Sequence, residues 1–128
     1  MRLNCIGAFT ACSYSAINGT AACGSVWLNV DVVRNHWNWS GVIESDCNAV
    51  NNPYMCGPSP AAMKRCSTAV ARAAQGLQAT VDMGCQAPYG DLPAAVNQSV
   101  GGATIAQMRQ SVASPLPPVS PVSSAHSR

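Results

Sequence analysis

A carboxylate at the end of a short apolar run is the side chain of this sequence best placed for chemistry. Val42 and Ile43 follow Gly41 and are typical of a short buried strand, and residues 44–48 then turn polar as Glu-Ser-Asp-Cys-Asn. In folds that alternate strands and helices, reactive groups gather where strands end. Asp46 there can act as a nucleophile, a general base or an ion ligand; it equally fits the N-cap of a following turn or helix.

Where the leaving group of such an attack must be protonated, a second carboxyl group nearby can act as the acid. Glu44 precedes Asp46 by two positions, and residues at that spacing on a strand point to the same face. Glu44 is therefore the sole local candidate by geometry. The other acidic side chains are Asp31, Asp82 and Asp91.

The composition excludes several classes of partner. Charged residues make up 9% and apolar residues 48% of the 128 residues, which favours a buried piece of a globular protein over a disordered chain. A net charge of +2 without a basic cluster gives no electrostatic case for nucleic acid or an anionic membrane, and we expect neither as a partner. Polar residues interrupt the uncharged stretch 3–30 too often for a membrane span.

Cysteine is the most unusual feature of the composition. Seven cysteines leave at least one unpaired within the chain. No Cys-x-x-Cys occurs, and His36 and His126 are far apart, so we expect no structural zinc. We expect no cofactor either.

The cysteine density favours an oxidising compartment. Three N-glycosylation acceptor triplets fit that compartment, at Asn18, Asn38 and Asn97. No apolar segment follows Met1, so we expect no signal peptide within this chain. An oxidised chain without an export signal suggests that its beginning is missing.

The first half of the chain predicts a strand, a loop, a helix and the strand before Asp46. The first strand is expected near residues 10–14, and the loop 15–24 has Asn18-Gly19 as its turn. Ser25 is a helix cap, and the helix that follows has an apolar face. That face consists of Val26, Val30, Val33 and Trp37. We expect the tryptophans to pack in the core or as a lid.

The second half predicts a long helix, a strand and two short helices. Ser59-Pro60 is a strong helix start. The apolar stripe along one face of this helix comprises Ala62, Cys66, Ala69, Val70, Ala73 and Leu77. A strand over 79–85 follows, then helices capped by Asp91 and Thr104. The tail, residues 113–128, is rich in Ser and Pro and is expected to be disordered.

Strands that alternate with helices in this order imply parallel βαβ units in an α/β fold. Three strands make a poor closed sheet, because a complete eight-stranded barrel needs about 200 residues or more. The chain therefore forms a small open sheet or part of something larger.

Four segments in order resemble glycoside hydrolase family 3, and within it the β-xylosidase branch. The family carries Cys-Ser/Ala-Tyr-Asn-x-Val-Asn-Gly-x-Pro-x-Cys, a helix ending in Trp, Gly-Tyr-Val-x-Ser-Asp-Cys-Asp-Ala-Val, and Ala-Gly-x-Asp-x-Asp-Cys-Gly. Residues 12–19 (Cys-Ser-Tyr-Ser-Ala-Ile-Asn-Gly) and 45–50 (Ser-Asp-Cys-Asn-Ala-Val) carry the likeness most clearly. It covers roughly residues 10–112 and includes the matching positions Cys23, Trp37, Asp82 and Cys85.

The resemblance implies a fold and an activity. Family members have a (β/α)8 TIM-type barrel followed by a second α/β domain, so residues 1–112 would be the C-terminal part of an incomplete N-terminal barrel domain, about three parallel strands with helices. The family cleaves β-linked sugars with retention. The implied substrates are β-linked xylan or glucan oligosaccharides or aryl glycosides, and the implied location is extracellular or in the secretory pathway. The missing barrel half and the second domain are expected in the full-length protein.

The resemblance also assigns residues. Asp46 matches the family's nucleophile, and Tyr14 matches a tyrosine near that nucleophile and the sugar. Cys47 stands where β-glucosidases of the family usually have Trp, which favours the xylosidase branch. The family's acid comes from the later domain, so we expect it to be absent from this chain and Glu44 not to be catalytic.

The expected arrangement of parallel strands suggests two disulfides. Cys47 and Cys85 would end neighbouring parallel strands, which lie about 4.8 Å apart, and Cys12 and Cys23 would staple the loop between them. The remaining cysteines have no family counterpart. Cys66, on the apolar stripe, is expected to be a buried free thiol.

Departures from the family pattern keep a second interpretation open. Ser15 replaces Asn, Asn48 replaces Asp, Thr80 replaces Gly and Gly84 replaces the second Asp. The alternative is a non-catalytic remnant that binds sugar weakly or assembles with other chains through open sheet edges. An unrelated cysteine-stapled module is a third hypothesis, which the ordered motifs disfavour.

Overall fold

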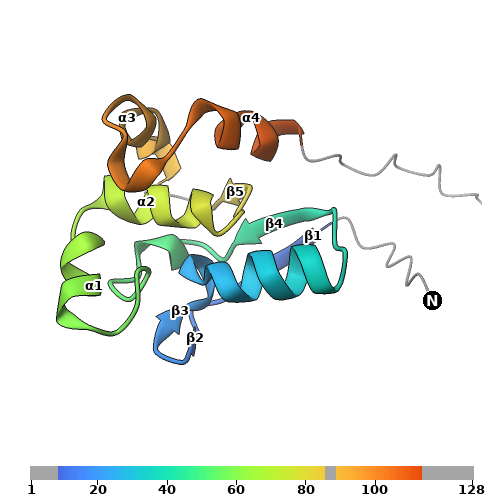
Figure 1. The fold of residues 1–128 in the computed structure, drawn as a ribbon, viewed down its shortest axis with the longest axis horizontal. Helices are drawn as coiled ribbons and strands as arrows, with labels where there is room; N and C mark the ends of the chain where they lie inside the picture. Colours follow the sequence, from blue (N-terminus) through green and yellow to red (C-terminus); the bar gives the residue numbers. More distant parts are fainter. Residues whose placement is uncertain (1–8, 86–88, 114–128) are drawn as a thin grey trace, which may run out of the picture.

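A three-stranded parallel sheet lies at the centre of the computed structural model, which describes residues 9–85 and 89–113 (Figure 1). The strand order is β1 (Phe9–Cys12), β4 (Val42–Ser45) and β5 (Met83–Gly84). Val42 and Ile43 are buried, as expected for the central strand. The predicted mixed α/β fold with a parallel sheet is therefore confirmed. The predicted tail from residue 114 onward lies outside the described residues.

The segment after β1 is a hairpin rather than a simple loop. β2 (Ala16–Ile17) and β3 (Thr20–Ala21) pair antiparallel, and the short 3-10 helix η1 (Ala22–Gly24) follows. The predicted turn is present: Asn18 and Gly19 both have positive φ, of 50° and 76°. Both central residues of a tight hairpin turn need such values, which Asn and Gly tolerate. A side chain at Gly19 would also collide with Pro58.

The helix after Ser25 is a π-helix, η2 (Trp27–His36). Ser25 lies at its start as predicted, because its Oγ accepts a hydrogen bond from the Leu28 amide at 3.2 Å. At the other end, the Trp37 amide donates to the carbonyl of Val32, five residues back, at 2.8 Å. A π-helix has a wider turn than an α-helix, so its faces have a different residue spacing.

The predicted apolar face of this helix is wrong for that reason. Trp37 is 66% exposed and Val26 is 40% exposed, although both belong to the predicted stripe. Asn29 is buried instead, and its side-chain amide donates to the carbonyl of Ala22 at 2.8 Å. Only Val33 of the stripe packs against the buried core.

The long helix predicted from Ser59 is divided in two. α1 (Pro60–Arg65) begins as expected, with the Ser59 hydroxyl accepting from the Ala62 amide at 3.1 Å. The helix then stops, and α2 (Ala69–Gln78) begins anew with Thr68 as its N-cap. The break follows from local chemistry, since Thr68 competes as a cap and Cys66 is fixed by a disulfide.

The remaining helices are short. η3 (Ala49–Asn51) directly follows β4. The last described part of the chain forms η4 (Tyr89–Asp91), α3 (Leu92–Asn97), η5 (Val100–Gly102) and α4 (Ile105–Ala113). Asp91 is the N-cap residue of α3, as predicted, but its backbone is helical and its side chain makes no cap bond. Thr104 does cap α4, accepting from the Gln107 amide at 3.2 Å.

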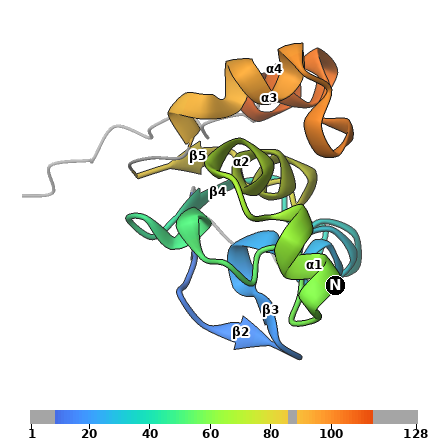
Figure 2. The ribbon, with the colours of Figure 1, turned by 90° about the vertical axis from the view of Figure 1, so that its left-hand side faces the viewer.

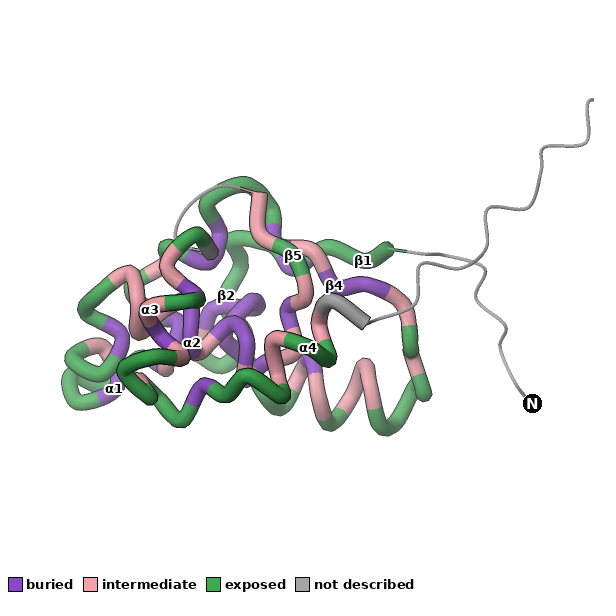
Figure 3. The backbone as a smooth tube through the Cα atoms, turned by 90° about the horizontal axis from the view of Figure 1, so that it is seen from above, coloured by how far each residue is buried: buried purple, intermediate pink, exposed green. Residues whose placement is uncertain are grey.

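Two buried clusters form the core. One includes Ile43, Val50 and Met55 and lies around β4, and the other joins α2 to α3 and α4 (Figure 2). Figure 3 shows β1 largely exposed beside the buried β4, and three of the four β1 residues are exposed. The tryptophan prediction holds only for Trp39, which packs on the first cluster, whereas Trp27 and Trp37 are more than half exposed. Within the described ranges, no helix has the length and apolar character to cross a bilayer.

Candidate active site

Asp46 directly follows the central strand, at its carboxyl end. Its amide donates to the carbonyl of Cys12 on one side at 3.0 Å, and the Asn48 amide donates to the carbonyl of Cys85 on the other at 3.2 Å. Asn48 takes a left-handed conformation, with φ of 66°, which Asn tolerates better than most residues. Residues 46–48, the polar corner, are therefore held between the ends of β1 and β5.

The Asp46 side chain is exposed and does not cap η3. Its Oδ1 accepts from the amide of the next residue, Cys47, at 2.7 Å. The N-cap of η3 is Asn48, which makes no side-chain cap bond. The N-cap interpretation of Asp46 is thus wrong for the helix that follows it, and its second carboxylate oxygen has no hydrogen bond to any other described residue.

An open cleft of about 270 Å³ lies over this corner. It is lined by the residues that end all three strands, from Ala11 on β1 to Cys85 after β5. Among the described residues, its carboxylates are Glu44 and Asp46, so both residues that the sequence paired by their spacing line this cleft. Glu44 is half-buried and Asp46 exposed.

The other acidic residues serve elsewhere. The Asp82 side chain is only 4% exposed and forms an ion pair with Arg34 at 2.6 Å, while the Ile43 amide donates to the same carboxylate oxygen at 2.9 Å. Asp31 is exposed on η2, and Asp91 ends η4. None of these three lines the cleft.

Arg34 is a positioning residue that the sequence did not indicate. Its guanidinium donates to the carbonyl of Gly41 at 2.5 Å, to the carbonyl of Thr80 at 3.2 Å and to Asp82. It therefore joins η2 to the segments that lead into β4 and β5. The sequence pattern had placed Arg34 only on the polar side of a helix, and a partner 48 positions away leaves no local signal.

Tyr14 lies against the turn that carries Asp46. Its hydroxyl donates to the carbonyl of Cys47, although the side chain is 55% exposed. The structure thus brings Tyr14 to the residue next to Asp46. Tyr14 is not among the residues that line the cleft.

Disulfides lie on both sides of the corner. Cys47 is bonded to Cys85, with Cα atoms 4.4 Å apart, and Cys12 is bonded to Cys23, with Cα atoms 5.1 Å apart. These are the two pairs that the sequence suggested. The first joins the ends of β4 and β5, and the second joins the end of β1 to η1.

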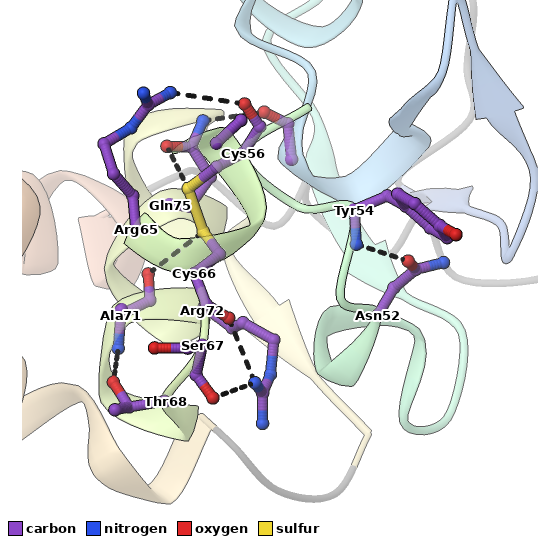
Figure 4. Close-up of a disulfide and its surroundings, with 12 residues drawn as sticks. Asn52, Tyr54, Cys56, Arg65, Cys66, Ser67, Thr68, Ala71, Arg72 and Gln75 are labelled. Carbon is purple, nitrogen blue, oxygen red and sulfur yellow. Dashed lines mark hydrogen bonds between the residues drawn. A yellow bond between two sulfur atoms is a disulfide. The ribbon is translucent and has the colours of Figure 1, made fainter. Parts of the chain in front are cut away.

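A third disulfide overturns the prediction of a free thiol. Cys66 is fully buried but bonded to Cys56, which links the loop after η3 to the end of α1 (Figure 4). Burial on an apolar stripe does not distinguish a thiol from a disulfide. The high number of cysteines, seven, was the available signal for further disulfides. Cys56 lies only ten positions from Cys66, so this pair could have been proposed from the sequence.

Comparison with known proteins relates the chain to β-xylosidases. No family model matches the sequence. The probable exo-1,4-beta-xylosidase bxlB of Aspergillus terreus is 34% identical over 95 residues, which cover 71% of this chain and 12% of that protein. The exo-1,4-beta-xylosidase bxlB of Emericella nidulans is 46% identical over 48 residues, covering 35% of this chain and 6% of that protein.

A further relative is the probable exo-1,4-beta-xylosidase bxlB of Aspergillus clavatus, 31% identical over 77 residues, or 58% of this chain and 9% of that protein. The chain thus spans about an eighth or less of the length of the curated relatives that it matches.

Proposed function

We propose that this chain is a segment of a retaining β-glycosidase of the family 3 type and supplies the nucleophile, Asp46. One observation carries the proposal: an exposed carboxylate ends the central strand of a parallel sheet, in a cleft formed by the ends of all three strands. Chemistry is commonly placed at that end of such sheets. The sequence relationship to exo-1,4-beta-xylosidases supports a β-xyloside as the substrate.

The proposal includes a larger fold. β1 and β5 each have one neighbour in the described sheet, whereas every strand of a closed barrel has two. Residues 1–112 would contribute about three strands to a (β/α)8 barrel, with residues 113–128 as a tail. The exposed residues of β1 support this arrangement, since strands of parallel sheets are normally covered on both faces.

The chemistry assigned to Asp46 is a double displacement. Its carboxylate oxygen attacks the anomeric carbon, the bond from that carbon to the leaving oxygen breaks, and an acid supplied outside this chain protonates the leaving oxygen. Water then attacks the same carbon, gives a proton to the conjugate base of that acid, and releases the carboxylate. Tyr14, through its bond to the Cys47 carbonyl, fixes the turn beside the nucleophile.

A non-catalytic remnant is the second candidate. Glu44 is the only other carboxylate in the described cleft, and the family does not use that position as an acid. A chain without an acid would bind β-linked sugars weakly or associate with other chains through β1 and β5. The flanking transcript sequence separates the candidates, because only the first requires an upstream barrel half and a downstream domain.

A chimera tests the nucleophile directly. Residues 10–112 would replace the aligned segment of the Aspergillus terreus relative, and hydrolysis of 4-nitrophenyl β-xyloside would be measured. We expect turnover in the chimera and a loss in kcat on the order of 10⁴-fold for Asp46→Ala, because the covalent step is removed. Added azide should restore turnover in that variant and yield an α-glycosyl azide.

The matched control is Asp31→Asn, an exposed acidic residue outside the cleft, which should retain the activity of the chimera. A 2-fluoro-glycoside should label the chimera on Asp46. A folded chimera without turnover would favour the remnant, and a label on any other residue would refute the assignment of Asp46.

A further inference from the structure

The tip of the β2–β3 hairpin presents an acceptor triplet in an accessible form. Asn18-Gly19-Thr20 spans the two-residue turn and the first residue of β3. Asn18 is exposed, and within the described residues its side-chain amide has no hydrogen-bond partner. A substituent on that amide nitrogen therefore breaks no interaction of the fold.

We propose that Asn18 is the main N-glycosylation site of this chain. The donor is a lipid diphosphate-linked oligosaccharide. The Asn18 amide nitrogen forms a bond to the first sugar carbon and loses one proton, while the bond from that carbon to the diphosphate oxygen breaks and the lipid diphosphate leaves. The three disulfides of the described residues fit the compartment in which this transfer occurs.

The other two triplets are held more firmly. In Asn38-Trp39-Ser40, the Trp39 ring packs against the core and its amide donates to the carbonyl of Val33 at 3.0 Å. Asn97 ends α3, and the amide of the next residue, Gln98, donates to the carbonyl of Ala94 at 3.0 Å. Asn38 and Asn97 are exposed as well, but each lies at or just after the hydrogen-bonded end of a helix, η2 or α3.

The tip of the hairpin is less constrained than its base. At the base, Ala21 on β3 is buried and its amide donates to the carbonyl of Tyr54 at 3.1 Å. β2 and β3 share only two residue pairs, and Ala16 on β2 and Asn18 at the tip are exposed. Gly19 as the middle residue of the triplet also places no bulky side chain between Asn18 and the Thr20 hydroxyl.

A glycan at Asn18 fixes which side of the molecule faces water. The hairpin lies on the opposite side of the structure from α3 and α4 in both ribbon views (Figures 1 and 2). A large hydrophilic group there is incompatible with burial of the hairpin under another domain. This inference is independent of the role of Asp46.

The test is expression of the full 128-residue chain behind a secretion leader in yeast. Both secreted and membrane-fraction protein would be treated with peptide N-glycosidase in heavy-oxygen water, and the peptides would be sequenced by mass spectrometry. We expect Asn18 to appear mainly as labelled Asp. Asn18→Gln and Thr20→Val should abolish that glycan, and Thr20→Ser should retain it.

Asn38→Gln and Asn97→Gln are the matched controls, and the occupancy of Asn18 should stay within about twofold of the parent chain in both. Protein retained in the cell is analysed together with secreted protein, so that poor secretion does not bias the measured occupancy. Recovery of the Asn18 peptide mainly unmodified, or higher occupancy at Asn38 or Asn97, would overturn the proposal.

Discussion

Thr80 is a β-branched residue in a conformation that such residues avoid. Its φ is 55°, and it stands where the family pattern has Gly. Arg34 compensates in part, since its Nε donates to the Thr80 hydroxyl at 3.3 Å and its guanidinium also donates to the Thr80 carbonyl. The backbone strain of a left-handed non-glycine residue costs about 1–2 kcal/mol.

Replacement of Thr80 should separate the strain from the hydrogen bond. We expect Thr80→Asn to raise the free energy of unfolding by about 1 kcal/mol, because Asn tolerates positive φ and keeps an oxygen for Arg34. Thr80→Val keeps the strain, loses the acceptor and should lower it by about 1 kcal/mol. Urea unfolding monitored by tryptophan fluorescence would measure both. A Thr80→Asn chain less stable than the parent would contradict the role assigned to strain.

Some residues of the site were accessible to sequence reasoning and others were not. Asp46 stood out because a strand pattern and a polar cluster meet at one point, and Cys47 and Cys85 because each ends a predicted strand. The Arg34–Asp82 pair and the Cys56–Cys66 bond depend on how the chain folds back on itself. Residue type alone does not encode such contacts.

At the scale of elements, α2 depends on its own start signal. The Thr68 hydroxyl accepts from the Ala71 amide at 3.1 Å, and α2 packs against α3 through buried residues that include Ala73, Ala74 and Leu77. α2 thus begins at Ala69, four residues after α1 ends at Arg65. Periodicity predicted the buried stripe but not the interruption, because the same apolar spacing continues across the break.

A cap substitution tests this start signal. We expect Thr68→Ala to lower the free energy of unfolding by about 1 kcal/mol, since it leaves the Ala71 amide without its partner. Thr68→Ser keeps the hydroxyl and should remain within about 0.5 kcal/mol of the parent. Denaturant unfolding of the disulfide-bonded chain measures both. Equal losses in the two variants would show that the methyl group, and not the cap, is what matters.

The local signals predicted the starts of helices better than their registers. Ser25, Ser59 and Thr104 all lie at helix starts, because a cap depends on residues within one turn. The π-helical register of η2 depends instead on tertiary contacts, including the buried Asn29 and the Arg34 network. An assumed period of 3.6 residues therefore chose the wrong face.

For the whole molecule, the parallel pairing of the strands followed from the alternation of strands and helices along the chain. Closure of the sheet did not, because three strands are compatible with an open sheet and with part of a barrel. The described chain leaves one edge of β1 and one edge of β5 without a strand partner. In the proposed barrel, a catalytic site shared with further strands would be incomplete in this chain.

The 128-residue chain alone should therefore show no turnover of 4-nitrophenyl β-xyloside above the buffer rate. In the proposed function, the acid that protonates the leaving oxygen is supplied outside this chain. The assay is release of nitrophenolate, with the active chimera as the positive control. Turnover by the isolated chain that disappears in Asp46→Ala would contradict this expectation and would make Glu44 the acid to examine.

The three disulfides differ in what must be folded before each forms. Cys12–Cys23 and Cys56–Cys66 close short segments, with separations of 11 and 10, whereas Cys47–Cys85 has a separation of 38 and spans two strands with α1 and α2 between them. A chain can oxidise the first two with only local order. Protection of Cys47 and Cys85 from alkylation during oxidative refolding therefore reports when the neighbouring strands have come into register, without any need for an activity assay.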